Sequence, residues 1–148
     1  GRYSGRYGEV GVMANLRLNL DTALYAALNV AAVIAQATGG VWNSLAPRSA
    51  NPPYVIFQAA SKVEEYRFDG RGMTARYIVK AVSREPWPKQ ASTVDTQIDA
   101  ALQDATLTIT GFTQLLCRRE TDFYLAEERE GELWQHVGGV YQIMVDQT

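Results

Sequence analysis

The chain has 148 residues, a formal net charge of −2 at pH 7 and one cysteine. Its apolar fraction of 47% and charged fraction of 20% are typical of a globular protein and exclude a disordered chain. The small net charge argues against a dedicated duplex-DNA binder, which usually carries a basic domain or stripe. One cysteine cannot form an intramolecular disulfide, so nothing in the chain requires an oxidising compartment.

The first thirteen residues predict an extended, glycine-rich arm in which Gly-Arg-Tyr occurs twice. Arginine and tyrosine between glycines can bind single-stranded nucleic acid by stacking and charge, although two arginines contact few phosphates. Two other interpretations stay open: an arm that lies on a neighbouring subunit, or an extension ahead of a translation start at Met13. The residues that would make contacts are Arg2, Tyr3, Arg6 and Tyr7.

The chain shows no sign of membrane targeting. Residues 1–12 lack the apolar segment of a secretory signal. The richest apolar run, residues 23–35, is shorter than the roughly 20 residues of a membrane span. The sequence therefore predicts no membrane partner.

The clearest predicted element is a first helix that begins near Leu20. Its apolar residues recur every three or four positions, which is typical of a buried helical face. Gly39 and Gly40 supply residues that commonly end a helix. The predicted core positions are Leu20, Leu24, Leu28, Ala31 and Ala35.

A proline-containing loop follows, and residues 54–60 and 74–83 then predict two strands of a hairpin. In the second strand Tyr77, Val79 and Ala81 share one face. The opposite face mixes charged and apolar groups, as a sheet surface facing a partner often does. Its residues are Arg76, Ile78, Lys80 and Val82.

A second amphipathic helix is predicted from Pro88, which suits a first helical turn, to Ala105. Residues 112–119 and 135–145 predict two more strands, and an acidic loop lies between them. The chain is therefore expected to be α+β, with two helices on one face of a mainly antiparallel sheet of four to five strands. The predicted organisation is an arm over residues 1–13 and a single domain over residues 14–148.

Residues that could carry catalysis are few. His136 is the only histidine, and Glu132 lies four positions before it, but a zinc site usually needs three or four protein ligands. We therefore expect His136 at the surface or at a strand edge. Cys117 precedes Arg118 and Arg119, which could lower the pKa of a thiol. Because Cys117 would share one face of an alternating strand with Leu115 and Thr113, a buried apolar role is favoured.

From about Leu20 to Val145 the chain resembles the tail-completion, or tail terminator, proteins of long-tailed bacteriophages. The stretches that carry the resemblance are "LDTALYAALN", "NPPYVIF", "RYIVKAVSRE", "VDTQIDAALQDATLTITG" and "LWQHVGGVYQIMV". It rests on their joint order, since none is a specific motif alone. The arm lies outside the resemblance.

The resemblance implies a structural virion protein without catalytic residues, metal or other cofactor. Such a protein forms a ring, usually a hexamer, which caps the tail tube, ends its polymerisation and joins the tail to the head. It implies assembly in the host cytoplasm, a place at the head-proximal end of the tail, and tube and neck or connector proteins as partners.

The predicted lateral contacts are Arg76, Lys80 and the arm. The acidic loop is expected at an axial rim or in the lumen, where negative charge would let DNA slide through as cargo. A solvated hairpin tip is the alternative for this loop. Its candidate residues are Asp122, Glu127, Glu128, Glu130 and Glu132.

Three other functions stay open at this stage. One is another neck ring, such as a connector or stopper, or a minor tail protein. The second is a small nucleic-acid-binding module that uses the arm. The third is a small enzyme or ligand-binding domain that uses Cys117 or His136.

Overall fold

The computed structural model describes residues 16–67 and 70–147. Residues 16–28 form a first helix, and a short and a long helix follow. The remaining elements in chain order are α2 (Ala31–Gln36), β1 (Val41–Asn43), β2 (Tyr54–Arg67), β3 (Gly70–Ser83), α3 (Lys89–Leu102), β4 (Phe112–Arg129) and β5 (Glu132–Gln147).

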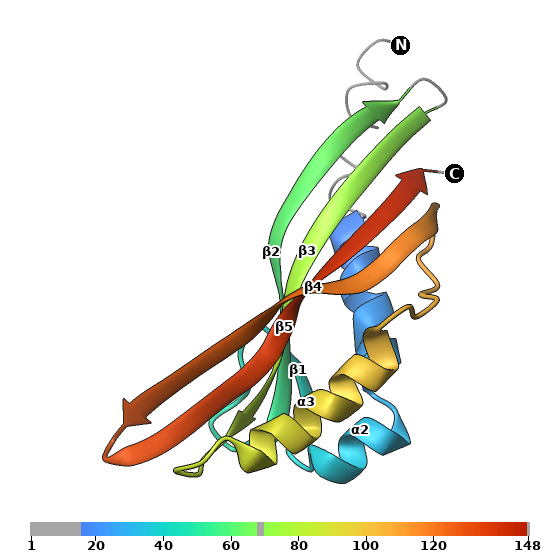
Figure 1. Ribbon diagram of the computed structural model, residues 1–148. Coiled ribbons are helices and arrows are strands. Elements are labelled where there is room, and N and C mark those ends of the chain that lie inside the picture. The colour runs from blue at the N-terminus through green and yellow to red at the C-terminus, as the bar shows by residue number, and fades with distance from the viewer. Residues whose placement is uncertain (1–15, 68–69, 148) are drawn as a thin grey trace.

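The strands form one sheet of order β1-β2-β3-β5-β4, in which β1 is parallel to β2 and the other pairs are antiparallel. β2 and β3 form one long hairpin, and β4 and β5 form another. In Figure 1 the two hairpins extend in opposite directions: β2 ends and β3 begins at the upper end of the molecule, and β4 ends and β5 begins at the lower left. The predicted α+β fold with a mainly antiparallel sheet is confirmed.

The described helices cover one face of the sheet (Figure 1). Alternate residues of β3 and β5 point to them, and Tyr77, Tyr141 and Ile143 are fully buried there. α3 contributes Ile98 and Leu102, also fully buried. Burying a large apolar side chain stabilises a fold by roughly 1.5–3 kcal/mol, so this layer holds the main core. The predicted division of β3 into two faces is therefore correct.

The predicted first helix is divided in the structure. Its leucines are buried as expected, but the chain bends before α2, where Val30 is extended with φ −119° and ψ 157°. Ala31 and Ala35, which were predicted to be buried, are exposed. Val33 and Ala37 are fully buried instead. Because of the bend, Val33 is buried in place of Ala31. The larger valine side chain removes more apolar area from water.

The acidic segment is not the loop that the sequence predicted. β4 continues through it to Arg129 and β5 starts at Glu132, so the turn consists of Glu130 and Gly131 alone. Both turn residues have positive φ, 53° and 79°, as tight hairpin turns of the primed types require. The hairpin projects from the body, and strands with water on both sides can carry charged residues on either face. The segment therefore lacks the alternation of apolar and polar residues by which a strand is predicted from sequence.

Two bulges in β4 change which residues share a face. The register shifts between Gln114 and Leu116 and again between Arg119 and Thr121. Cys117 is buried, as predicted, but Leu115 is 48% exposed. The prediction that these two residues share a face is wrong because a bulge inserts an extra residue into the strand.

Candidate interaction surface

The face of the sheet opposite the helices carries a small apolar cluster at one end and charged residues along its strands. The loop over residues 44–53 lies against the cluster through Ala46 and Ala50. This face is therefore only partly covered by the chain itself. The cluster consists of Tyr54, Ile56, Val82 and Trp134.

Arg76 and Lys80, the predicted interface residues of β3, lie half-buried on this face. The Arg76 Nε atom donates to Glu120 over 2.7 Å, and a second bond of 3.4 Å reaches the other carboxylate oxygen. The Lys80 Nζ atom lies 5.4 Å from the centroid of the Phe123 ring. Burial lowers the pKa of this amine. Both side chains are thus held by β4, and their contact with a partner stays a prediction.

Glu127 joins two cationic side chains on the same face. Arg129 donates to its Oε1 atom, and the His136 Nε2 atom lies 2.6 Å from that oxygen. The hydrogen bonds from Arg129 and His136 lower the pKa of Glu127. Burial lowers the pKa of His136, although Glu127 acts in the opposite direction. The expected surface position of His136 is wrong, because its side chain is buried within β5.

His136 and Glu132, which were considered from the sequence as metal ligands and disfavoured, do not pair in the described residues. Glu132 instead faces Arg84, with 3.6 Å between the Oε2 and Nε atoms. Within residues 16–67 and 70–147, no group of three His, Cys, Asp or Glu side chains could hold a metal ion.

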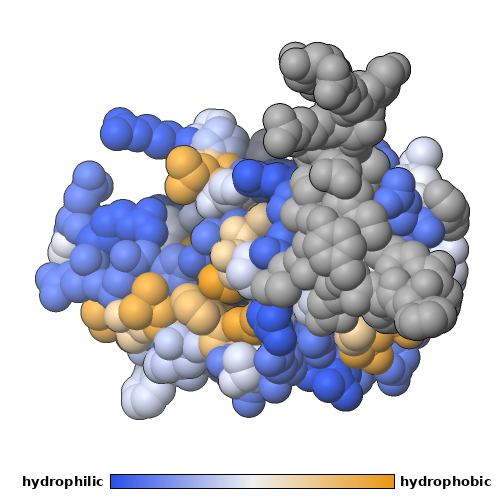
Figure 2. All heavy atoms as spheres, turned by 90° about the horizontal axis from the view of Figure 1, so that it is seen from above, coloured by the Kyte–Doolittle hydropathy of each residue, from blue (hydrophilic) through white to orange (hydrophobic). Residues whose placement is uncertain are grey.

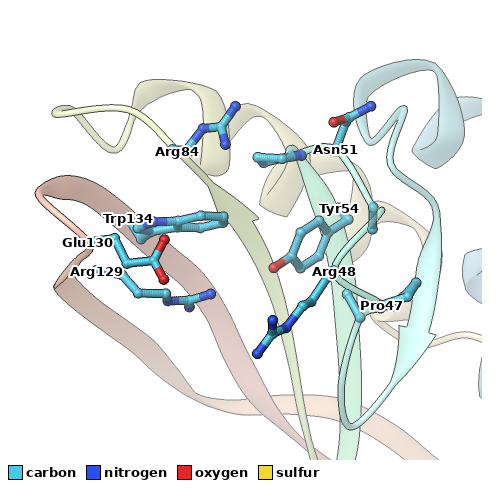
Figure 3. A pocket seen from close by; sticks show the side chains of 11 residues that line it. Pro47, Arg48, Asn51, Tyr54, Arg84, Arg129, Glu130 and Trp134 are labelled. Atoms are coloured by element: carbon cyan, nitrogen blue, oxygen red, sulfur yellow. The ribbon is translucent and has the colours of Figure 1, made fainter.

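A cavity of 470 Å³ opens at the end of this face, between the 44–53 loop and the β4–β5 turn (Figure 3). Trp134 forms one wall. The central guanidinium carbons of Arg84 and Arg129 lie 5.8 and 4.3 Å from its ring. Figure 3 shows these two groups above and below the indole, with Arg48 and Tyr54 facing it from the other side.

The acidic residues predicted for a rim or lumen all lie on the β4–β5 hairpin. Glu128 and Glu130 form no ion pair with the described residues, and Glu130 lines the cavity. The other three pair with arginine side chains of the same chain. These are Asp122 with Arg119, Glu127 with Arg129, and Glu132 with Arg84.

Arg119 forms a polar network that the sequence did not reveal. Its guanidinium donates two bonds to Asp95 of α3, over 2.9 and 3.0 Å, and one of 3.4 Å to the Tyr141 hydroxyl. Although burial opposes it, hydrogen bonding to Asp95 raises the pKa of Arg119 above its ordinary value. A Cβ atom at Gly139 would lie 2.5 Å from the Arg119 Nε atom, so a larger residue there would displace the Arg119 side chain from this network. We assign this network to holding α3 on the sheet.

Cys117 has the properties of a buried thiol. Its side chain is 2% exposed, and the Sγ atom donates to the Leu102 carbonyl over 3.3 Å. Burial raises its pKa to about 11, with a smaller contribution from Asp104. Because the thiolate is the nucleophilic form, these observations disfavour an enzyme that uses Cys117.

The exposed surface elsewhere offers apolar side chains between hydrophilic ones. Seen from the end at which β5 finishes, separate apolar patches lie among hydrophilic residues (Figure 2). No helix within the described ranges is long and apolar enough to cross a membrane. The arm residues Arg2, Tyr3, Arg6 and Tyr7 lie outside the described residues.

The sequence missed Arg48, Arg84, Arg129 and Trp134 as a group. Proline and glycine identified the 44–53 segment as a loop, but no local pattern places that loop beside the β4–β5 turn. The only features in the sequence that could have indicated this group are an arginine in a proline-rich loop and a tryptophan in the last strand.

Comparisons with known proteins place the chain among phage tail proteins. A family model described as "Tail completion protein gp17" matches residues 22–145. A solved chain from "Virion of native gene transfer agent (GTA) particle" superposes with a TM-score of 0.76 at 15% identity, over 88% of this chain and 97% of that chain. A second solved chain has a TM-score of 0.53 at 15% identity, with coverages of 89% and 95%. A search of curated proteins gave no match.

The two structural likenesses show a shared fold, and the family model goes further. Its match begins within the first helix and ends within β5, so it includes β1 to β4 in full and most of β5. The resemblance predicted from the sequence over nearly the same residues is confirmed. The chain belongs to the family of phage tail completion proteins and is a structural component of the phage tail.

Proposed function

We propose that six copies of the chain form a closed ring at the head-proximal end of the tail. In this proposal the ring caps the tail tube, ends its polymerisation and joins it to the neck. Residues 14–148 act as one domain, and residues 1–13 act as an arm on the neighbouring copy. The tube protein and a neck protein are the axial partners, and DNA passes through the lumen as cargo.

The observation that carries the proposal is the pair of open strand edges on opposite sides of the sheet. β4 is an edge strand over its 18 residues. On the other side β1 pairs with β2 only from Val55 to Phe57, so the rest of β2 has no further strand partner among the described residues. Open edges of this length favour pairing with another chain.

These two edges differ, which favours a ring over a two-fold dimer. A contact between the β4 edge of one copy and the β2 edge of the next is heterologous. Heterologous contacts form rings when the rotation between subunits closes. Arg76 and Lys80 lie on β3, the middle strand of the sheet, and we propose that they contact a neighbouring copy across the face that the helices leave uncovered.

Glu128 and Glu130 are our candidates for the rim or lumen. Their carboxylates have no ion pair with described residues, so their charge is available to repel DNA phosphates. Glu128→Gln, at a residue that does not line the cavity, should assemble normally and slow DNA ejection from the particle. Ejection at the wild-type rate would count against this placement.

Native mass spectrometry of the full chain tests the ring. We expect a closed species of six times the 16.4 kDa chain mass. A variant without residues 1–12 should lose this species if the arm joins neighbouring copies. An unchanged ring would remove the arm from the interface.

A monomer in solution would move the test to tail tubes of the same phage. Tubes that stop growing when the chain is added, with the chain at one end, would support the cap. Tubes that bind the chain but keep growing would favour another neck ring. A stable dimer that ignores the tubes would overturn the proposal.

A further inference from the structure

We propose that the cavity beside Trp134 is a carboxylate-binding pocket that receives an acidic side chain of a neighbouring tail protein. This inference rests on the proposed place of the chain in a tail ring and adds the chemistry of one contact. The pocket is built by three segments: the 44–53 loop, the residue after β3, and the β4–β5 turn.

The lining of the pocket has more positive than negative groups. Three guanidinium groups and one carboxylate, that of Glu130, line it. Arg48 pairs with no carboxylate among the described residues. A guanidinium presents parallel donors that match the two oxygens of a carboxylate, so Arg48 is suited to an incoming Asp or Glu.

Arg84 is also available to a partner. Its ion pair with Glu132 spans 3.6 Å between side chains that are 48% and 57% exposed. Exposed pairs of this kind contribute little and exchange readily. The Trp134 ring meanwhile holds the guanidinium groups of Arg84 and Arg129 in place by cation–π contact (Figure 3). Two of the three guanidinium groups are therefore positioned before a ligand binds.

The surroundings favour a protein ligand over DNA. Glu127, Glu130 and Glu132 balance the three arginines, so the hairpin end has little net charge to attract a polyanion. The cavity is concave and has Trp134 and Tyr54 in its walls, which suits one side chain with an apolar stem. Leu45 and Leu133, each next in sequence to a lining residue, are 83% and 47% exposed. Exposed apolar residues around a polar anchor are typical of a protein interface.

The test is carbodiimide crosslinking in intact phage particles that carry Arg48→Lys. This variant keeps the positive charge and introduces an amine that can form an amide with a nearby carboxylate. Wild-type particles lack that amine. Arg118→Lys is the matched control, because Arg118 is an exposed arginine of β4 that does not line the cavity.

We expect mass spectrometry to identify an amide between residue 48 of the variant and an Asp or Glu of a different tail protein. That product should be absent from wild-type and Arg118→Lys particles. A product only with Glu130, or with a second copy of this chain, would overturn the proposal. So would complete particles without any product.

A charge reversal separates the pocket from the ring. Arg48→Glu should reduce attachment of the partner at least tenfold while native mass spectrometry still shows the wild-type oligomer. Loss of binding to a short DNA duplex, without any protein crosslink, would assign the pocket to phosphate and overturn our inference. A wild-type chain that forms no ring and caps no tube would instead overturn the proposed function.

Discussion

The two faces of the sheet use the same strands but hold their side chains by different means. On the helix-covered face, Tyr77 and Tyr141 are fully buried against a continuous apolar core. On the opposite face, Arg76 and Lys80 are half-buried and make contacts across neighbouring strands. The difference indicates that stability is concentrated on the first face. The second face has charged groups and a small apolar cluster that the helices do not cover.

The largest expected effect comes from the helix-covered face. Ile98→Ala should lower the free energy of unfolding by about 2–5 kcal/mol, because it removes a fully buried side chain and leaves a cavity. Urea unfolding measures the change. Leu45→Ala, at a position that is 83% exposed, should change it by less than about 0.5 kcal/mol. Equal losses in both variants would contradict the concentration of stability in this core.

A smaller loss is expected at the network between β4 and α3. Arg119→Gln should cost about 2 kcal/mol, since it removes charge-assisted bonds and leaves Asp95 without its partner. The same urea experiment on Arg118→Gln, at the exposed neighbouring position, supplies the control. If the two variants unfold at the same urea concentration, Arg119 does not hold the helix as we infer.

The opposite face should make stability depend on pH. Burial lowers the pKa of His136 below 6.5, so the unfolded chain binds more protons as the pH falls through that value. Stability should therefore decrease below pH 6.5, and again below 4.5, where the lowered pKa of Glu127 matters. Unfolding in urea at a series of pH values gives the slope. His136→Gln should reduce the decrease in unfolding free energy that begins below pH 6.5. An unchanged decrease in this variant would show that other groups cause it.

The smallest effect on folding is expected at Arg76. Its ion pair with Glu120 lies at the surface, and such pairs contribute little. Arg76→Gln should leave the urea midpoint within error and reduce the fraction of chain in the ring seen by native mass spectrometry. Lys80→Gln should act in the same way. Destabilisation without a change in oligomer would instead make Arg76 a folding residue.

Sequence periodicity determined the parts of the fold that depend on one buried face. The spacing of Ile98 and Leu102 predicted α3, and the alternation around Tyr141 predicted β5. The order of these elements also carried the resemblance to tail-completion proteins, because order and burial pattern are local properties of the chain. Buried Cys117 followed from the same alternation, although a bulge changed its neighbours.

Tertiary structure alone decided the bend at Val30, the continuation of β4 through the acidic segment and the meeting of three arginines at Trp134. The bend depends on which side chain fills the core. Helical spacing alone does not determine whether Val33 or Ala31 is buried. Arg48 and Arg129 meet Trp134 because the sheet order β2-β3-β5-β4 brings their segments to one end. Such contacts depend on how strands that are distant in sequence pair, and the residue pattern within one segment does not determine that pairing.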